Sequence, residues 1–487
     1  MVTRQAAALV LAVALIAGCV SGAESGRSAS PTPDPRGPGL TGVDCPEGLA
    51  VATTCWLVEV PLTTDTPEAT TTVSVVVVPG TDPSSPRSLA VLQGGPGSPS
   101  SEMALWLPPQ PFPQVFIDQR GTGFADVSLN CDEADAQAER QLSLGFAMAE
   151  MVADQADEDC AARLSDEPLL AATTTAAMAN DVGVVMAALG YDRWLVYGVS
   201  YGSSIALEVM AQAPEGLEGA ILDGVYPPSV DQSISVPLSA ERSLGLLNDR
   251  CQASTTCPTD QNLDALFAKS YDRLRRTPET LTVFNVGELD EATVVFDAET
   301  LAFVVFLSLY QEQTAFMLPA LLDGMSRGDD DALYWMAWVG SNLMLENVYG
   351  NNEGTYSVVN CQDWVVSGQP PESVGRLGSA LASVLATRDC ARWGVEELTS
   401  PRPAVVSDLP ALLLSGEFDP ITPPSMADEA AEGLAQATIV VQPDRGHGIW
   451  FGNDCIQGIV EEFVSVAGSN PDISCAEQPT PIVWATQ

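Results

Sequence analysis

Histidine and lysine are nearly absent from this chain of 487 residues: His447 is its only histidine and Lys269 its only lysine. One imidazole cannot complete a Cys/His zinc site, and no Cys-x-x-Cys pair occurs among the eleven cysteines. Positive charge is scarce in general, since 20 Lys and Arg face 64 Asp and Glu and leave a formal net charge of −44. Such a chain repels nucleic acid and anionic membrane surfaces. The sequence therefore excludes nucleic acid as a partner and predicts neither a metal site nor another cofactor.

The apolar run near the N-terminus, residues 6–17, is too short to remain as a membrane-spanning helix. It follows Arg4 and ends before Gly18 and Cys19, a pattern typical of a secretory signal. Residues 15–19 resemble a bacterial lipobox, which predicts a signal peptide over 1–18 and a lipid on Cys19; simple secretion is the alternative. Residues 19–42 are rich in Ser, Gly and Pro and predict a flexible tether. We expect an exported protein that is either lipid-anchored at the outer face of a bacterial membrane or secreted.

The other ten cysteines are an even number, which favours disulfides in an exported protein. Pairing each cysteine with its neighbour along the chain predicts Cys45–Cys55, Cys131–Cys160, Cys251–Cys257, Cys361–Cys390 and Cys455–Cys475. The sequence alone does not fix this connectivity, so the local scheme is one of many.

Short apolar segments suited to strands recur at 56–60, 72–78, 89–92, 115–117, 194–197, 220–222, 411–414 and 438–441. Helical periodicity marks residues 172–189 between two of them and then dominates at 236–248, 264–276, 301–325 and 332–345. Alternating strands and helices predict an α/β fold with a mostly parallel sheet covered on both faces. We expect a core over 43–228, an inserted helical cap over 229–360, and a C-terminal part of the core over 361–487.

A Gly-x-Ser-x-Gly motif, Gly198-Val199-Ser200-Tyr201-Gly202, lies between a predicted strand and a predicted helix. This is the context of a nucleophile elbow, in which small residues let the strand and helix backbones pass closely and leave the serine at the apex. An ordinary strand-to-helix turn with an incidental serine is the alternative. The motif predicts Ser200 as a nucleophile.

A serine nucleophile needs a base and a carboxylate that orients the base. His447 follows the last predicted strand and lies between glycines, and Asp419 ends the preceding strand. The chain order Ser200, Asp419, His447 is that of the α/β-hydrolases. Asp419 could otherwise cap a helix, but the three residues together predict a catalytic triad.

The oxyanion of an acyl-transfer reaction needs backbone N–H donors. One is expected from Tyr201, directly after the nucleophile, and the other from the loop Gly94-Gly95-Pro96-Gly97. Proline has no N–H, so Gly95 is the candidate in this loop.

These motifs, with Asp118-Gln119-Arg120-Gly121 and the run from Gly416 to Thr422, resemble the proline iminopeptidase and tripeptidyl aminopeptidase group of α/β-hydrolases. The Ser-Tyr-Gly elbow and the cysteine-rich exported chain are more similar to the tripeptidyl aminopeptidase branch, including its bacterial lipoprotein serine proteases. The resemblance covers the chain from Cys45 onward and is weakest across the cap. It implies an α/β-hydrolase fold and a serine exopeptidase that removes short peptides or single residues from peptide N-termini. Gln93 departs from relatives that carry His or Pro before the glycines, which leaves the shape of the oxyanion loop open.

An aminopeptidase must also hold an α-ammonium group, which favours a carboxylate in the site. Asp363 is the first candidate, with a solvated surface acid as its alternative. Thr422 is a second candidate for substrate binding; it could also hydrogen-bond within the catalytic loop or cap the next helix. Asp118 and Arg120 are expected to hold the loop beside the oxyanion turn. A carboxylesterase or lipase with the same triad, and a tethered binding protein with an inactive hydrolase fold, are the competing functions; the oligomeric state stays open.

Overall fold

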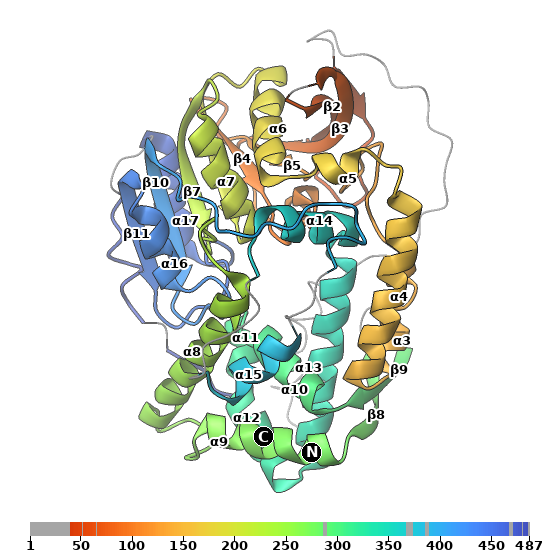
Figure 1. Cartoon of the computed structure of the whole chain (residues 1–487). Coiled ribbons are helices and arrows are strands. Elements are labelled where there is room, and N and C mark those ends of the chain that lie inside the picture. The colour runs from red at the N-terminus through yellow and green to blue at the C-terminus, as the bar shows by residue number, and fades with distance from the viewer. Residues whose placement is uncertain are drawn as a thin grey trace.

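The computed structural model describes residues 39–485 except 51, 65, 286–289, 367–373, 385–388, 467–470 and 480. The expected signal peptide, most of the tether and Cys19 lie outside this range. Within it, none of the helices has the length and apolar character needed to cross a membrane. The described chain forms a sheet-based unit and a mainly helical unit below it in the view of Figure 1.

A nine-stranded sheet carries the first unit, in the order β1-β2-β3-β5-β4-β6-β7-β10-β11. Its strands are β1 Leu40–Val43, β2 Thr54–Thr63, β3 Thr66–Val78, β4 Ser88–Leu92, β5 Gln114–Ile117, β6 Trp194–Val199, β7 Leu217–Asp223, β10 Ser407–Gly416 and β11 Leu434–Gln442. The pairs from β5 to β11 are parallel, whereas β1, β2 and β3 add antiparallel pairs at one edge. All eight segments expected as strands are strands, and β1 is an addition.

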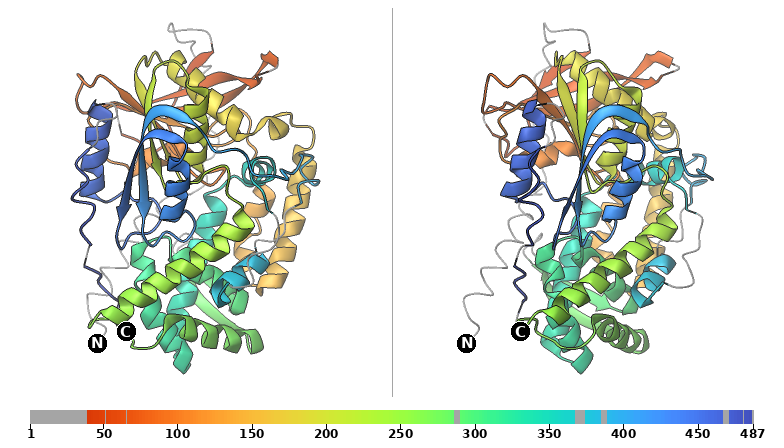
Figure 2. Two further views of the ribbon diagram at one scale, coloured as in Figure 1. Left: turned by 60° about the vertical axis from the view of Figure 1, so that its left-hand side comes forward. Right: turned by 90° about the vertical axis from the view of Figure 1, so that its left-hand side faces the viewer.

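Helices cover both faces of this sheet, as Figure 2 shows. One face packs against α6 (Thr175–Ala188), α7 (Tyr201–Gln212) and α16 (Pro424–Ala431). The other packs against the short 3-10 helix η1 (Ser100–Leu105) and α17 (Asp454–Val466). Because both faces are buried, the central strands are apolar throughout, and every residue of β4 and β6 is buried.

The second unit has its own apolar core. Its elements are α8 Gln232–Ala253, α9 Leu263–Arg276, β8 Glu279–Asn285, β9 Asp290–Phe296, α10 Ala298–Ser308, α11 Glu312–Ala315, α12 Leu318–Arg327, α13 Asp330–Tyr349 and α15 Arg376–Val384. Helix α14 (Glu353–Asp363) follows α13 but packs its buried valines, Val358 and Val359, into clusters of the sheet-based unit and its neighbouring helices. The β8–β9 hairpin was not expected, although Val283, Val294 and Phe296 alternate in a way typical of strands.

The single helix expected over 301–325 is wrong, because the chain forms three helices there. Pro319 explains the start of α12, since it has no N–H for the preceding turn and its ring excludes the carbonyl four residues earlier. The break between α10 and α11 leaves the Tyr310 carbonyl free of a helical hydrogen bond, and that carbonyl accepts the amide of His447 at 2.7 Å.

Segments outside 229–360 also pack on this second unit. Helix α15 lies on α8, and helix α3 (Ala138–Leu142) lies on β9, followed by α4 (Phe146–Leu164) at the side of the molecule (Figure 1). Near the C-terminus, the Trp484 ring meets Phe316 edge to face and donates a hydrogen bond to Ser254. The helical unit therefore includes helices from either side of the expected range 229–360 in the sequence. Two further short helices are α2 (Asp132–Asp135) and α5 (Leu169–Ala172).

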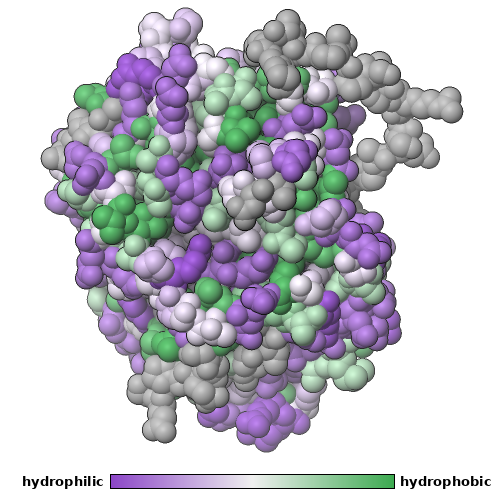
Figure 3. Space-filling model, turned by 45° about the horizontal axis from the view of Figure 1, so that its top comes forward, coloured by the Kyte–Doolittle hydropathy of each residue, from purple (hydrophilic) through white to green (hydrophobic). Residues whose placement is uncertain are grey.

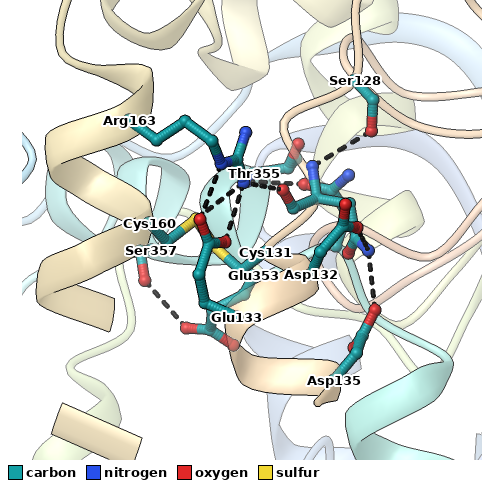
Figure 4. Close-up of a disulfide and its surroundings, with 12 residues drawn as sticks. Ser128, Cys131, Asp132, Glu133, Asp135, Cys160, Arg163, Glu353, Thr355 and Ser357 are labelled. Atoms are coloured by element: carbon teal, nitrogen blue, oxygen red, sulfur yellow. Dashed lines mark hydrogen bonds and ion pairs between the residues drawn. A yellow bond between two sulfur atoms is a disulfide. The ribbon is translucent and has the colours of Figure 1, made fainter. Parts of the chain in front are cut away.

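The ten described cysteines form the five expected neighbour pairs. Figure 4 shows the bond between Cys131 and Cys160, which ties the start of α2 to α4 beside the ion pair of Arg163 with Glu133. On the face drawn in Figure 3, hydrophilic side chains separate small groups of hydrophobic ones.

Candidate active site

Ser200 lies at the sharp turn between β6 and α7. Its backbone has φ 56° and ψ −125°, a left-handed φ that a non-glycine residue rarely adopts. The flanking glycines allow the turn: a Cβ on Gly198 would lie 2.1 Å from the Gly202 carbonyl oxygen, and one on Gly202 would lie 2.4 Å from the Leu92 carbonyl oxygen. Such strain persists only where the surroundings enforce it, and it clusters at functional sites.

Asp419 and His447 form a buried pair at the ends of β10 and β11. The Asp419 Oδ2 lies 2.8 Å from His447 Nδ1 and accepts the Thr422 hydroxyl at 2.7 Å. The other oxygen, Oδ1, accepts the amides of Ile421 and Thr422 at 2.9 and 2.8 Å. Asp419 has no exposed surface, so four hydrogen bonds take the place of water around its charge.

The environment shifts both pKa values in the direction of an ion pair. Burial by itself lowers the pKa of His447, but the charge and hydrogen bond of Asp419, with a contribution from Asp223, raise that pKa above its ordinary value. Burial raises the pKa of Asp419, but His447 and Thr422 outweigh it and hold that pKa below its ordinary value. The pair therefore favours a carboxylate beside an imidazole that readily takes a proton.

The imidazole lies close to the turn that carries Ser200. A Cβ on Gly224 would come within 2.9 Å of His447 Cε1, and the preceding residue, Asp223, accepts the Ser200 amide on its backbone oxygen at 2.9 Å. On its other side the ring meets Tyr310 edge to face, with centroids 5.2 Å apart. The three predicted triad residues thus follow the carboxyl ends of the parallel strands β6, β10 and β11, at one edge of the sheet.

The glycine loop after β4 faces the same serine. A Cβ on Gly94 would lie 2.7 Å from Ser200 Cβ and 3.2 Å from Ser200 Oγ. The Gly94 amide donates to the Gln93 side chain at 3.0 Å, whereas the Gly95 amide meets no acceptor among the described residues. Tyr201 begins α7, where the first amides have no intrahelical acceptor. The backbone amides of Gly95 and Tyr201 are therefore suited to the expected role of oxyanion donors.

Gln119 holds this loop in place, a role that the sequence analysis missed. Its side-chain oxygen accepts the Gly97 amide at 2.9 Å, and its side-chain nitrogen lies 3.0 Å from the Gln93 carbonyl and 2.7 Å from the Gly94 carbonyl. Gln119 is buried, so these bonds replace its contact with water. The motif that contains it was noted, but nothing in the sequence says that the amide side chain turns toward the loop.

The neighbours of Gln119 have separate structural partners. Asp118 accepts the Ser74 hydroxyl at 2.6 Å and the Ser101 amide at 2.7 Å, and burial raises its pKa to about 6 against these hydrogen bonds. Arg120 forms a buried two-pronged ion pair with Asp181 and donates to three backbone carbonyls. Asp118 therefore supports the start of η1, while Arg120 ties the turn to α6 and to the end of β2.

Asp363 is not arranged to receive a substrate ammonium, contrary to the expectation. Its carboxylate accepts the amide and hydroxyl of Thr175 at 2.7 and 2.8 Å and lies 3.6 Å from the Arg402 guanidinium. Burial raises its pKa, while Arg402 and Thr175 oppose the rise. Asp363 instead anchors the start of α6, next to the Tyr201 hydroxyl that lies 3.0 Å from Thr175 Oγ1.

Thr422 is likewise turned inward rather than toward a substrate. It is 1% exposed, and its hydroxyl donates to Asp419 while lying 3.0 Å from His447 Nδ1. Of the roles considered for it, hydrogen bonding within the catalytic loop is the one its geometry matches, and substrate binding is not.

Known proteins resemble this chain in sequence. Residues 375–475 match the family model described as TAP-like protein. Serine protease Hip1 of Mycobacterium tuberculosis is 24% identical over 426 residues, which are 79% of this chain and 79% of that protein. Tripeptidyl aminopeptidase of Streptomyces coelicolor is 24% identical over 367 residues, 72% of this chain and 64% of that protein. A solved proline iminopeptidase of Mycobacterium smegmatis is 16% identical with a TM-score of 0.41, covering 85% of this chain and 100% of that chain. The resemblance inferred from the motifs is confirmed.

Proposed function

We propose that this chain, a serine hydrolase with the α/β-hydrolase fold and tripeptidyl aminopeptidase-like relatives, is an exopeptidase that removes short peptides or single residues from peptide N-termini. The observation that carries the proposal is the strained backbone of Ser200 beside a buried pair of Asp419 with the one imidazole of the chain. The named activities of the relatives favour peptides over esters as substrates.

In the proposed reaction, Ser200 Oγ attacks the scissile carbonyl carbon while His447 takes the hydroxyl proton. Asp419 stays ionised, orients the ring through Nδ1 and stabilises the imidazolium. The amides of Gly95 and Tyr201 donate to the developing oxyanion. His447 then gives its proton to the leaving amine. Water attacks the acyl-enzyme carbonyl while His447 takes a proton from it, and His447 returns that proton to Ser200 Oγ as the acyl product leaves.

A substrate panel separates this function from the carboxylesterase alternative. Aminoacyl, dipeptidyl and tripeptidyl p-nitroanilides, each with a free and an acetylated N-terminus, are compared with p-nitrophenyl esters, and Ser200→Ala is the control for background hydrolysis. A charge-assisted hydrogen bond to the ammonium contributes ~1.5–3 kcal/mol. Acetylation is therefore expected to lower kcat/KM about tenfold or more. Equal cleavage of free and acetylated peptides, or cleavage of esters alone, would overturn the exopeptidase assignment.

A separate variant, Asp363→Asn, tests whether Asp363 is the residue that receives the substrate ammonium. Because Asp363 is occupied by Thr175 and Arg402, the variant is expected to lose stability and yet keep the ratio of rates on free and acetylated substrates. A ratio that collapses toward one would return Asp363 to the role of amine acceptor.

Export and lipid attachment stay part of the proposal, because Cys19 lies outside the described residues. Cys19→Ser is expected to abolish incorporation of a labelled fatty acid and to release the protein from the membrane fraction. Membrane association that survives in this variant, with no lipid detected on the wild type, would contradict the lipobox interpretation.

A further inference from the structure

A turn of two asparagines, Asn351 and Asn352, joins α13 to α14 and lies against the oxyanion loop. In Figure 1, α14 runs between the sheet and the helices of the cap. The backbone amide of Asn352 donates to the Gly97 carbonyl at 3.0 Å. The side chain of Asn351 accepts the Ser98 hydroxyl at 2.6 Å. The turn therefore contacts the oxyanion loop directly.

Asn352 is buried, and its side chain makes two hydrogen bonds of different kinds. Its oxygen accepts the Thr355 amide at 3.0 Å, which caps the first turn of α14. Its nitrogen donates to the Gly121 carbonyl at 2.9 Å, in the turn that also presents Gln119. One side chain thus joins a cap helix to the turn that holds the oxyanion loop from the core side.

The fit between the two segments is close enough to require glycine in the loop. A Cβ on Gly97 would lie 2.6 Å from the Asn352 carbonyl oxygen, and one on Gly95 would lie 2.9 Å from Asn351 Oδ1. Both glycines have left-handed φ values of 97° and 99°. Glycine is therefore needed at positions 95 and 97 because the turn of Asn351 and Asn352 lies so close, in addition to the need for a substrate to approach the loop.

We propose that Asn352 is a positioning residue that sets the oxyanion loop against Ser200 from the cap side, opposite Gln119. The inference rests on the proposed function, in which the Gly95 amide binds the oxyanion. Donors must lie within hydrogen-bond range of the place where the oxyanion forms, so a loop released from one of its two supports loses transition-state stabilisation. The substrate ground state makes less use of that geometry, so kcat carries the loss.

Asn352→Asp tests the proposal because it keeps the helix cap and replaces only the donor to Gly121. Aspartate caps a helix as well as asparagine does and keeps the bond from the Thr355 amide, but it presents a carboxylate oxygen instead of a donor to the Gly121 carbonyl. The matched control is Asn262→Asp in the cap, where an exposed asparagine caps α9 by the same bond to the Ala265 amide at 3.0 Å. Asn352→Ser, which also keeps a capping oxygen but has a shorter side chain, provides a second variant.

Steady-state kinetics on the best amide or ester of the panel are expected to show kcat reduced about tenfold to hundredfold in both Asn352 variants, with KM changed less than threefold. These losses are smaller than those from deleting an oxyanion donor outright, about 10²–10³. Asn262→Asp is expected to match the wild type. A peptide boronic acid, which forms a tetrahedral adduct on Ser200, should lose affinity in step with kcat/KM, while the matching peptide alcohol should not.

Each other outcome has a distinct meaning. A kcat within twofold of wild type in Asn352→Asp and Asn352→Ser would overturn the proposal, and so would equal losses of kcat and thermal stability in Asn352→Asp and Asn262→Asp, because capping alone would then explain the effect. A wild-type protein that hydrolyses no substrate of the panel and is not labelled by a serine-reactive phosphonate would instead overturn the proposed function.

Discussion

Thr422→Val isolates one hydrogen bond inside the proposed triad. The change keeps the size of a buried side chain and removes the hydroxyl that donates to Asp419 Oδ2 at 2.7 Å. The two amide bonds to Oδ1 do not depend on this hydroxyl, and His447 stays within 2.8 Å of Oδ2. The perturbation is therefore confined to Asp419 Oδ2 and to His447 Nδ1, which lies 3.0 Å from the same hydroxyl.

The expected loss of catalytic rate in Thr422→Val follows from the strength of the hydrogen bond that is removed. A hydrogen bond to a charged group contributes ~1.5–3 kcal/mol, and a loss of ~1.4–2.7 kcal/mol from the transition state lowers the rate about tenfold to hundredfold. With one donor gone, the buried Asp419 charge depends more on the imidazolium, so the pKa of His447 should rise further. We expect a lower kcat at the pH optimum, an acid limb displaced to higher pH, and a KM close to that of the wild type.

The assay is the pH dependence of kcat and kcat/KM on a peptide anilide, together with thermal unfolding. Thr422→Ser keeps the hydroxyl and should recover most of the activity. Thr300→Val is the matched control, because Thr300 donates its amide and hydroxyl to Asp297 three residues earlier, at 3.0 and 2.8 Å, with no histidine in the arrangement. It should lose stability without losing kcat. A Thr422→Val enzyme within twofold of wild type at every pH would refute the reasoning.

Three further predictions follow from the site. Ser200→Ala should lower activity by about three orders of magnitude or more and abolish labelling by a serine-reactive phosphonate without unfolding the protein; persistent labelling would place the nucleophile elsewhere. The base acts in its neutral form and the pKa of His447 is raised in the folded protein, so kcat/KM should rise with pH through a midpoint above the ordinary value of ~6.5. The one imidazole signal in the proton spectrum should titrate with the same midpoint. A midpoint clearly below ~6.5 would contradict the pairing of His447 with Asp419. Burial, with Asp157 and Asp135 nearby, raises the pKa of Glu353 from 4.5 to about 8, so the folded state keeps a proton that the unfolded chain releases and stability should fall as pH rises through this window. Glu353→Gln should flatten that decline in melting temperature, and an unchanged slope would show that Glu353 ionises normally.

The core of the fold could be predicted from the sequence because its signals are local. Buried parallel strands appear as short apolar runs, and all eight that were expected are present. The turn at Ser200 and the strand ends at Asp419 and His447 followed from the same pattern, since residues after parallel strands share one edge of the sheet. The pairing of cysteines by proximity also holds in the structure, as each bond closes a loop of 6 to 29 residues.

The cap was less predictable because its boundaries depend on tertiary contacts. The β8–β9 hairpin has the alternation of strands, but the helical periodicity on both sides dominated the interpretation. Asp363 was expected in the site because it follows Cys361 on the return from the cap, yet the side chain points to Thr175 and Arg402 instead. The direction of a side chain depends on tertiary packing, which the periodicity of apolar residues in the sequence does not encode.

Two of the places where helices end inside the helical unit lie against the proposed catalytic loops. At the break after α10, the Tyr310 carbonyl accepts the amide of His447. At the turn before α14, the amide of Asn352 donates to the Gly97 carbonyl of the oxyanion loop. Each is a backbone bond, and at the second place the Asn352 side chain also holds the turn through its hydrogen bond to the Gly121 carbonyl. The hydroxyl of Ser243 in α8 adds a hydrogen bond to the Phe418 carbonyl, so the same helices contact the segments that carry Asp419, His447 and Gly97. The position of these helices therefore contributes to the geometry of the proposed base and of the proposed oxyanion loop.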